Sequence, residues 1–202
     1  MTDIISRLQN WVSSLFPKSE PLIDVPIIIP SPPVVAPPLI SLPPWMEVAK
    51  SLINTKETPG TADNPEILHW AKEIGVGKDY THDSIAWCGL FIGFCLRHSG
   101  LSIVGTPLWA RAWAVYGRFL AAPAFGAIMV FVREGGGHVG FYVSEDESYY
   151  HILGGNQSDA VNITRVAKDR CIAYRWPPNA DQYFKSGRIV KRFDGQVSYN
   201  EA

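Results

Sequence analysis

The sequence predicts an α+β fold, in which N-terminal helices pack on a five- to six-stranded antiparallel sheet. Apolar residues recur at helical spacing between residues 45 and 116, whereas the apolar runs from residue 127 onward are rich in β-branched and aromatic residues. Short polar or glycine-rich segments separate these later runs, as is typical of antiparallel strands that form a meander. Helices followed by strands indicate an α+β domain rather than an alternating α/β domain.

Three helices and a short helical segment are expected before the strands. Asn64 is expected to cap the second helix, with Pro65 at its first position. Asp83 or Ser84 is expected to cap the third helix, which would place Cys88 in its first turn. The expected ranges are Trp45–Ile53, Asn64–Gly75, a segment from Asp83 or Ser84 to Gly100, and Ala110–Tyr116.

The five apolar runs of the second half are the expected strands, namely Ala127–Arg133, His138–Ser144, Tyr149–Leu153, Val161–Val166 and Cys171–Trp176. The alternation of side chains along a strand would turn Val139, Phe141 and Val143 toward the core. His138 would then face the other way, directly after three glycines. An imidazole at a strand start beside small residues suits a base that faces a cleft, although a surface or edge histidine is the alternative interpretation.

The chain of 202 residues is expected to divide into four parts. The N-terminal amphipathic helix could dock on its own domain, a second copy, a partner or a membrane surface. Its polar face is not basic, which disfavours the membrane. The parts are the helix at 1–16, a proline-rich linker at 17–44, the compact domain at 45–178 and a polar tail at 179–202, which is expected to be loose or to add one strand.

Charge and cysteine spacing limit the expected partners and cofactors. The formal net charge is −1 and no block of Lys or Arg occurs, so nucleic acid is not an expected partner. Cys88, Cys95 and Cys171 show no zinc-binding spacing, and Cys88 and Cys95 would lie roughly 10 Å apart on one helix, too far for a disulfide. We therefore expect reduced thiols, no metal and no cofactor. The N-terminus does not have the pattern of a secretory signal, which favours a protein made in the cytoplasm.

Cys88 is the candidate nucleophile, because unpaired N–H groups and the helix dipole favour a thiolate in the first turn of a helix. A cysteine nucleophile needs a base and a group that orients the base. His138 is the candidate base. Asn156 could accept from its distal ring N–H and so select the tautomer, and His151 is the rival for that role. His69, His82 and His98 are expected to be structural or surface residues.

Five motifs, taken in order, carry a resemblance to a known family. They are Asp83-x-x-x-Trp87-Cys88, Ala110-Arg111-x-Trp113, Gly137-His138-Val139-Gly140-Phe141 and Gly154-Gly155-Asn156-Gln157, followed by Tyr174-Arg175-Trp176-Pro177. This order resembles the NlpC/P60 and CHAP superfamily of papain-like peptidoglycan hydrolases, in a phage- and bacteria-associated branch. The resemblance covers residues from about 45 to 177.

The resemblance implies a papain-like fold and a hydrolase that cuts an amide bond in the peptidoglycan stem peptide. It implies that Cys88 is the nucleophile, His138 the base and Asn156 the third member. The protein would act on the cell wall, as a stem-peptide endopeptidase or an N-acetylmuramoyl-L-alanine amidase, after release by a phage or delivery as an effector. A non-catalytic wall-binding or virion module and a protein-directed cysteine hydrolase are the alternatives. The expected substrate-binding residues are Asp83, Trp87, Trp113 and Gln157, with a core role as the favoured alternative for the two Trp residues.

Overall fold

The computed structural model describes residues 42–198. The predicted N-terminal helix, the linker up to residue 41 and the last four residues lie outside the described residues. The first helix in the described part begins at Pro44, one residue before the predicted helix start at Trp45. The helices are α2 (Pro44–Ser51), α3 (Pro65–Glu73) and α4 (Cys88–His98), with short 3-10 helices η1 (Ala110–Val115), η2 (Lys168–Arg170) and η3 (Asp181–Tyr183).

The predicted start of α3 is confirmed, and the predicted cap of α4 is wrong. The side chain of Asn64 accepts from the backbone N–H of Glu66, and Pro65 is the first residue of α3. Helix α4 begins at Cys88 with Trp87 as its N-cap residue, so Asp83 and Ser84 precede it by several residues. Cys88 nevertheless lies in the first turn, as the sequence predicted.

Six strands form one antiparallel sheet in the order β1-β6-β2-β3-β4-β5. The α+β class and the six-stranded sheet agree with the prediction. A simple meander is wrong, however, because β6 returns to pair with β2 instead of continuing beside β5. The strands are β1 (Arg118–Phe119), β2 (Ile128–Arg133), β3 (Gly136–Glu145), β4 (Tyr149–Gly154), β5 (Asn162–Ala167) and β6 (Cys171–Trp176).

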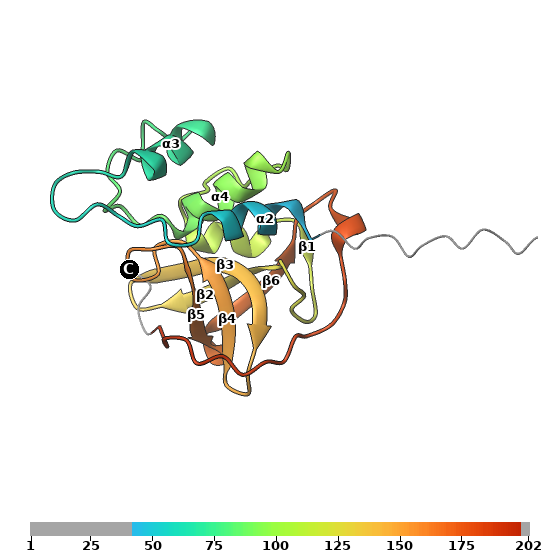
Figure 1. Cartoon of the computed structure of the whole chain (residues 1–202). Helices are drawn as coiled ribbons and strands as arrows, with labels where there is room; N and C mark the ends of the chain where they lie inside the picture. The colour runs from blue at the N-terminus through green and yellow to red at the C-terminus, as the bar shows by residue number, and fades with distance from the viewer. Residues whose placement is uncertain (1–41, 199–202) are drawn as a thin grey trace, which may run out of the picture. The chain divides into compact units, whose positions relative to one another are not determined.

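Helix α4 is the central helix of the domain and is buried from Cys88 to Leu96. Its Phe91 ring lies 6.1 Å from the Phe141 ring of β3, and its Phe94 stacks on Trp70 of α3 at 5.2 Å. In Figure 1, α2 and α4 lie together on one side of the sheet. This packing fixes the start of α4, and therefore Cys88, against the sheet.

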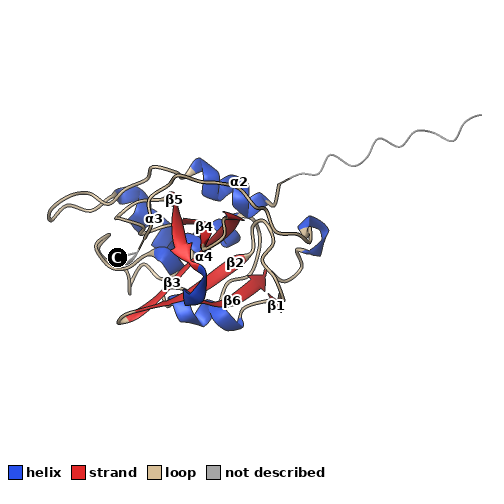
Figure 2. Cartoon of the chain, turned by 90° about the horizontal axis from the view of Figure 1, so that it is seen from below, coloured by secondary structure: helices blue, strands red, loops and turns tan. Residues whose placement is uncertain are grey.

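The C-terminal segment forms backbone hydrogen bonds with the sheet in its described part, which agrees with the predicted alternative of added strand pairing and not with a loose tail. Residues 189–191 pair with the end of β3, where Glu145 donates to Ile189 O and accepts from Lys191 N. Farther along, Arg165 of β5 donates to Gln196 O and accepts from Ser198 N. Figure 1 shows this segment passing along the side of the sheet away from α2 and α4, and Figure 2 shows the domain from below. The segment thus covers strand edges that would otherwise be unpaired.

Candidate active site

A cleft of about 580 Å³ opens at the start of α4. Cys88 lines it from the helix, and the glycine turn at 135–137 lines it from the start of β3. His138 follows this turn directly and is buried. The fold therefore brings together the predicted nucleophile and the chain segment that carries the predicted base. The remaining lining residues are Ala86, Leu108, Trp109, Ala110 and Arg111.

Gly89 explains how the loop before η1 can form a wall of this cleft. A β-carbon at Gly89 would overlap the carbonyl oxygen of Pro107, so only glycine allows this close approach. The same carbonyl accepts from the indole N–H of Trp113 at 3.0 Å, which anchors the loop on η1. Trp109 and Arg111, which follow Pro107, are thereby held beside Cys88.

Gln157, rather than Asn156, orients His138. The Nε2 atom of His138 lies 3.0 Å from Oε1 of Gln157. The Gln157 amide nitrogen donates to the carbonyl oxygens of Ile152 and Asn162, so its oxygen must be the atom that faces the imidazole. His138 Nε2 is therefore the protonated ring nitrogen in the neutral state, and Nδ1 is the atom that can act as a base. The predicted contact between Asn156 and His138 is wrong.

The two glycines directly before Asn156 leave space for the side chains of Gln157, His138 and Trp87. A β-carbon at Gly154 would lie 2.8 Å from Gln157 Oε1 and 3.2 Å from His138 Nε2. A β-carbon at Gly155 would lie 2.5 Å from the Trp87 ring. The Gly-Gly-Asn-Gln sequence is therefore more than a turn signal, because each glycine admits a different neighbouring side chain.

Asn156 fixes the backbone of Trp87, which precedes the candidate nucleophile Cys88 in the sequence. It has a φ of 56°, and its Oδ1 accepts from the backbone N–H of Trp87 at 3.1 Å. Its Nδ2 donates to Glu57 Oε1 at 3.1 Å, and the same oxygen accepts from the Trp87 indole at 2.7 Å. Burial raises the pKa of Glu57 above its ordinary value, and the hydrogen bond from Trp87 partly offsets that effect. Asn156 and Glu57 thus position the residue that precedes Cys88.

Three of the four residues predicted to bind substrate have structural partners instead. Trp87 and Trp113 are fully buried, so neither forms a cleft wall. Asp83 is 2% exposed, and its Oδ2 accepts from the backbone N–H groups of Thr58 and Asn64. Asp83 lines a separate polar pocket of about 350 Å³ with residues 56–60, and this pocket shares no lining residue with the Cys88 cleft. Its carboxylate shapes the loop at 58–64.

Gln157, the fourth predicted substrate-binding residue, is 1% exposed and directed at His138. The aromatic residue in the cleft is Trp109, which is 74% exposed. Arg111 also lines the cleft. Neither Trp109 nor Arg111 was predicted to lie there, although Arg111 belongs to the Ala-Arg-x-Trp motif. The signal in the sequence that could have indicated Trp109 is its position directly before that motif.

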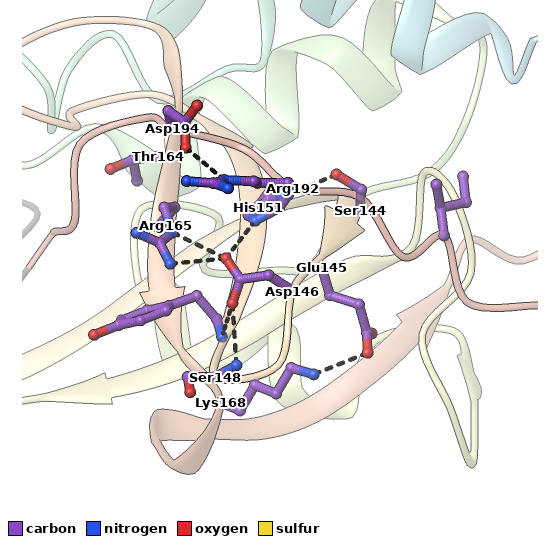
Figure 3. Close-up of polar contacts among 12 residues, drawn as sticks. Ser144, Glu145, Asp146, Ser148, His151, Thr164, Arg165, Lys168, Arg192 and Asp194 are labelled. Atoms are coloured by element: carbon purple, nitrogen blue, oxygen red, sulfur yellow. Dashed lines mark hydrogen bonds and ion pairs between the residues drawn. The ribbon is translucent and has the colours of Figure 1, made fainter.

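His151 belongs to a different buried cluster, so its predicted role as the rival orienter is wrong. Its Nδ1 lies 2.7 Å from Ser144 Oγ, and its Nε2 lies 3.0 Å from Asp146 Oδ2. Asp146 also accepts from Arg165, as Figure 3 shows. Phe193 packs against the His151 ring, with centroids 5.0 Å apart. This cluster ties β3, β4 and β5 to the C-terminal segment.

The other two cysteines are unsuited to act as nucleophiles. Burial raises the pKa of Cys95 well above its usual range and that of Cys171 to about 11. Both therefore remain thiols at neutral pH. His69, His82 and His98 lie on the surface near the carboxylates of Glu73 or Asp63, as predicted.

Comparisons with known proteins returned no matching family model, no matching curated protein and no matching solved structure. Of the helices in residues 42–198, none is both long and apolar enough to cross a membrane.

Proposed function

We propose that this protein is a cysteine hydrolase with a papain-like fold of the NlpC/P60 and CHAP type, which cleaves an amide bond in the peptidoglycan stem peptide. The observation that carries the proposal is the cleft shared by Cys88 and the turn leading into His138, with His138 Nε2 held 3.0 Å from Gln157 Oε1. A thiol on a helix start, an imidazole and an orienting carbonyl are the groups that acyl transfer through a thioester requires.

In the proposed reaction, the Cys88 thiolate attacks the carbonyl carbon of the amide, and the carbonyl oxygen becomes an oxyanion. The backbone N–H of Cys88 lies in the first turn of α4, where N–H groups have no acceptor within the helix, and it would donate to this oxyanion. The His138 imidazolium, held by Gln157, gives its Nδ1 proton to the leaving amine as the C–N bond breaks.

The second half of the reaction restores the thiolate. Nδ1 of His138 takes a proton from water while the water oxygen attacks the thioester carbonyl. The C–S bond then breaks, which releases the acid and leaves Cys88 as a thiolate beside an imidazolium. Gln157 accepts from Nε2–H in both halves, so the imidazole keeps one orientation throughout.

The biological setting proposed is a phage lysin or a delivered antibacterial effector.

The proposed hydrolysis is tested by incubating purified sacculi with the protein and identifying the released fragments by mass. New termini within the stem indicate an endopeptidase, whereas a free stem with an N-terminal alanine indicates an amidase. Release of no fragment, with binding to sacculi retained, would instead favour a non-catalytic wall-binding module. Cleavage of test proteins without release from sacculi would favour a protein-directed hydrolase.

A further inference from the structure

Arg111 is the residue that gives the cleft its charge. Among the described residues that line the cleft, it is the one with a charged side chain, and the others are apolar residues, glycines and Cys88. The carboxylates of Glu57, Asp83 and Asp159 line the separate polar pocket. The cleft also contains the N-terminal end of α4, whose dipole favours negative charge. Both features favour an anionic group on the bound molecule.

The guanidinium of Arg111 is fixed in place before any ligand arrives. Its Nε and Nη2 both donate to Gly136 O, at 3.0 and 2.7 Å. Gly137 admits the stem of the side chain, since a β-carbon there would lie 3.0 Å from Arg111 Cγ. These bonds use two of the five N–H groups of a planar fork. Arg111 is exposed and lines the cleft, and the fork keeps three further N–H donors for a ligand. A held guanidinium loses little conformational freedom on binding a carboxylate.

We infer that Arg111 forms a carboxylate-binding subsite beside Cys88, so that the preferred substrate carries a free carboxylate close to the scissile amide. The inference rests on the proposed stem-peptide hydrolysis. Two carboxylates of a stem peptide have the required chemistry, namely the α-carboxylate of a γ-linked glutamate and the C-terminal carboxylate. The exposed face of Trp109 is available to the apolar part of the same substrate.

The test compares synthetic stem peptides in matched pairs, in which either the glutamate α-carboxylate or the C-terminal carboxylate is replaced by a carboxamide. For the wild-type protein, we expect amidation at one of the two positions to lower kcat/KM by roughly 10- to 100-fold, because a charge-assisted hydrogen bond is lost. Arg111→Gln should lower cleavage of the free acid to near that of the amide and remove the preference. Arg97→Gln, at an exposed arginine outside the cleft, is the matched control and should keep the preference.

A preference that survives in Arg111→Gln, or equal rates for both members of each pair in the wild-type protein, would overturn the subsite while leaving the hydrolase intact. If no peptide is cleaved, calorimetric binding to Cys88→Ala decides the question. Tighter binding of the free acid, lost in Cys88→Ala/Arg111→Gln, would support the subsite although the proposed hydrolysis had failed. Equal binding of acid and amide to Cys88→Ala would overturn the subsite.

Discussion

Replacement of Gln157 by alanine tests the orientation of His138 most sharply. The change removes the acceptor that lies 3.0 Å from His138 Nε2. That hydrogen bond is charge-assisted whenever the imidazolium forms, and such bonds contribute about 1.5–3 kcal/mol. If the bond is needed only while the imidazolium is present, its loss corresponds to a fall in kcat of about 10- to 150-fold. KM should change little, because the buried Gln157 side chain does not line the cleft.

Stability must be measured beside activity, since Gln157 also donates to the carbonyl oxygens of Ile152 and Asn162. We expect Gln157→Ala to lower the free energy of unfolding by about 2–4 kcal/mol. Gln157→Glu is the matched variant, because it loses these donors but keeps an acceptor for His138. It should therefore retain more activity per folded molecule than Gln157→Ala. A folded Gln157→Ala protein with wild-type kcat would refute the role of Gln157.

Three further outcomes follow from the hydrogen bonds of Asn156 at the site and of His151 and Asp146 in the separate cluster. Asn156→Ala should lower the free energy of unfolding by roughly 2–4 kcal/mol, because Trp87 N–H and Glu57 lose their partner and alanine is strained at a φ of 56°. Asn156→Gly should unfold at a higher urea concentration than Asn156→Ala if this strain contributes. His151→Ala should cost about 2–4 kcal/mol of stability without lowering activity per folded molecule, and an inactive folded variant would contradict this. Burial alone would raise the pKa of Asp146, but hydrogen bonds, the first from His151, hold that pKa well below 3.8. The free energy of unfolding should therefore fall as the pH drops below about 4, because the folded protein resists protonation of Asp146. The fall should be smaller in Asp146→Asn, which has no carboxylate to protonate at this position.

The order of motifs was sufficient to predict that Cys88 and the turn before His138 lie at one cleft. The glycine-rich start of β3 is a strong local signal, whereas the start of α4 has no capping side chain and its predicted caps were wrong. The motif order could not decide whether Asn156 or Gln157 orients His138. Both are amides in one turn, and the direction of Asn156 depends on Glu57, which is 99 positions away in the chain. The burial of Trp87 and exposure of Trp109 likewise depend on packing between distant segments.

The fold shows the same division between local and distant effects. The pattern of apolar residues was enough to place five strands. The start of α3 was also predictable, because Asn64 caps the helix and Pro65 is its first residue. Strand β1 has only two residues, which is too short for any alternation to be visible. The pairing of β6 with β2, and of residues 189–198 with β3 and β5, joins strand edges that are remote in sequence. No local pattern specifies such partners.

The most direct test of the central claim is the release of fragments from purified sacculi by the wild-type protein, Cys88→Ala and Cys95→Ala. We predict that the wild-type protein releases stem-derived fragments and that Cys88→Ala, with an unchanged circular dichroism spectrum, releases none. Cys95→Ala should keep its activity per folded molecule while losing stability, because Cys95 is a fully buried core residue. Fragment release by folded Cys88→Ala at the wild-type rate would contradict the assignment of Cys88 as the nucleophile.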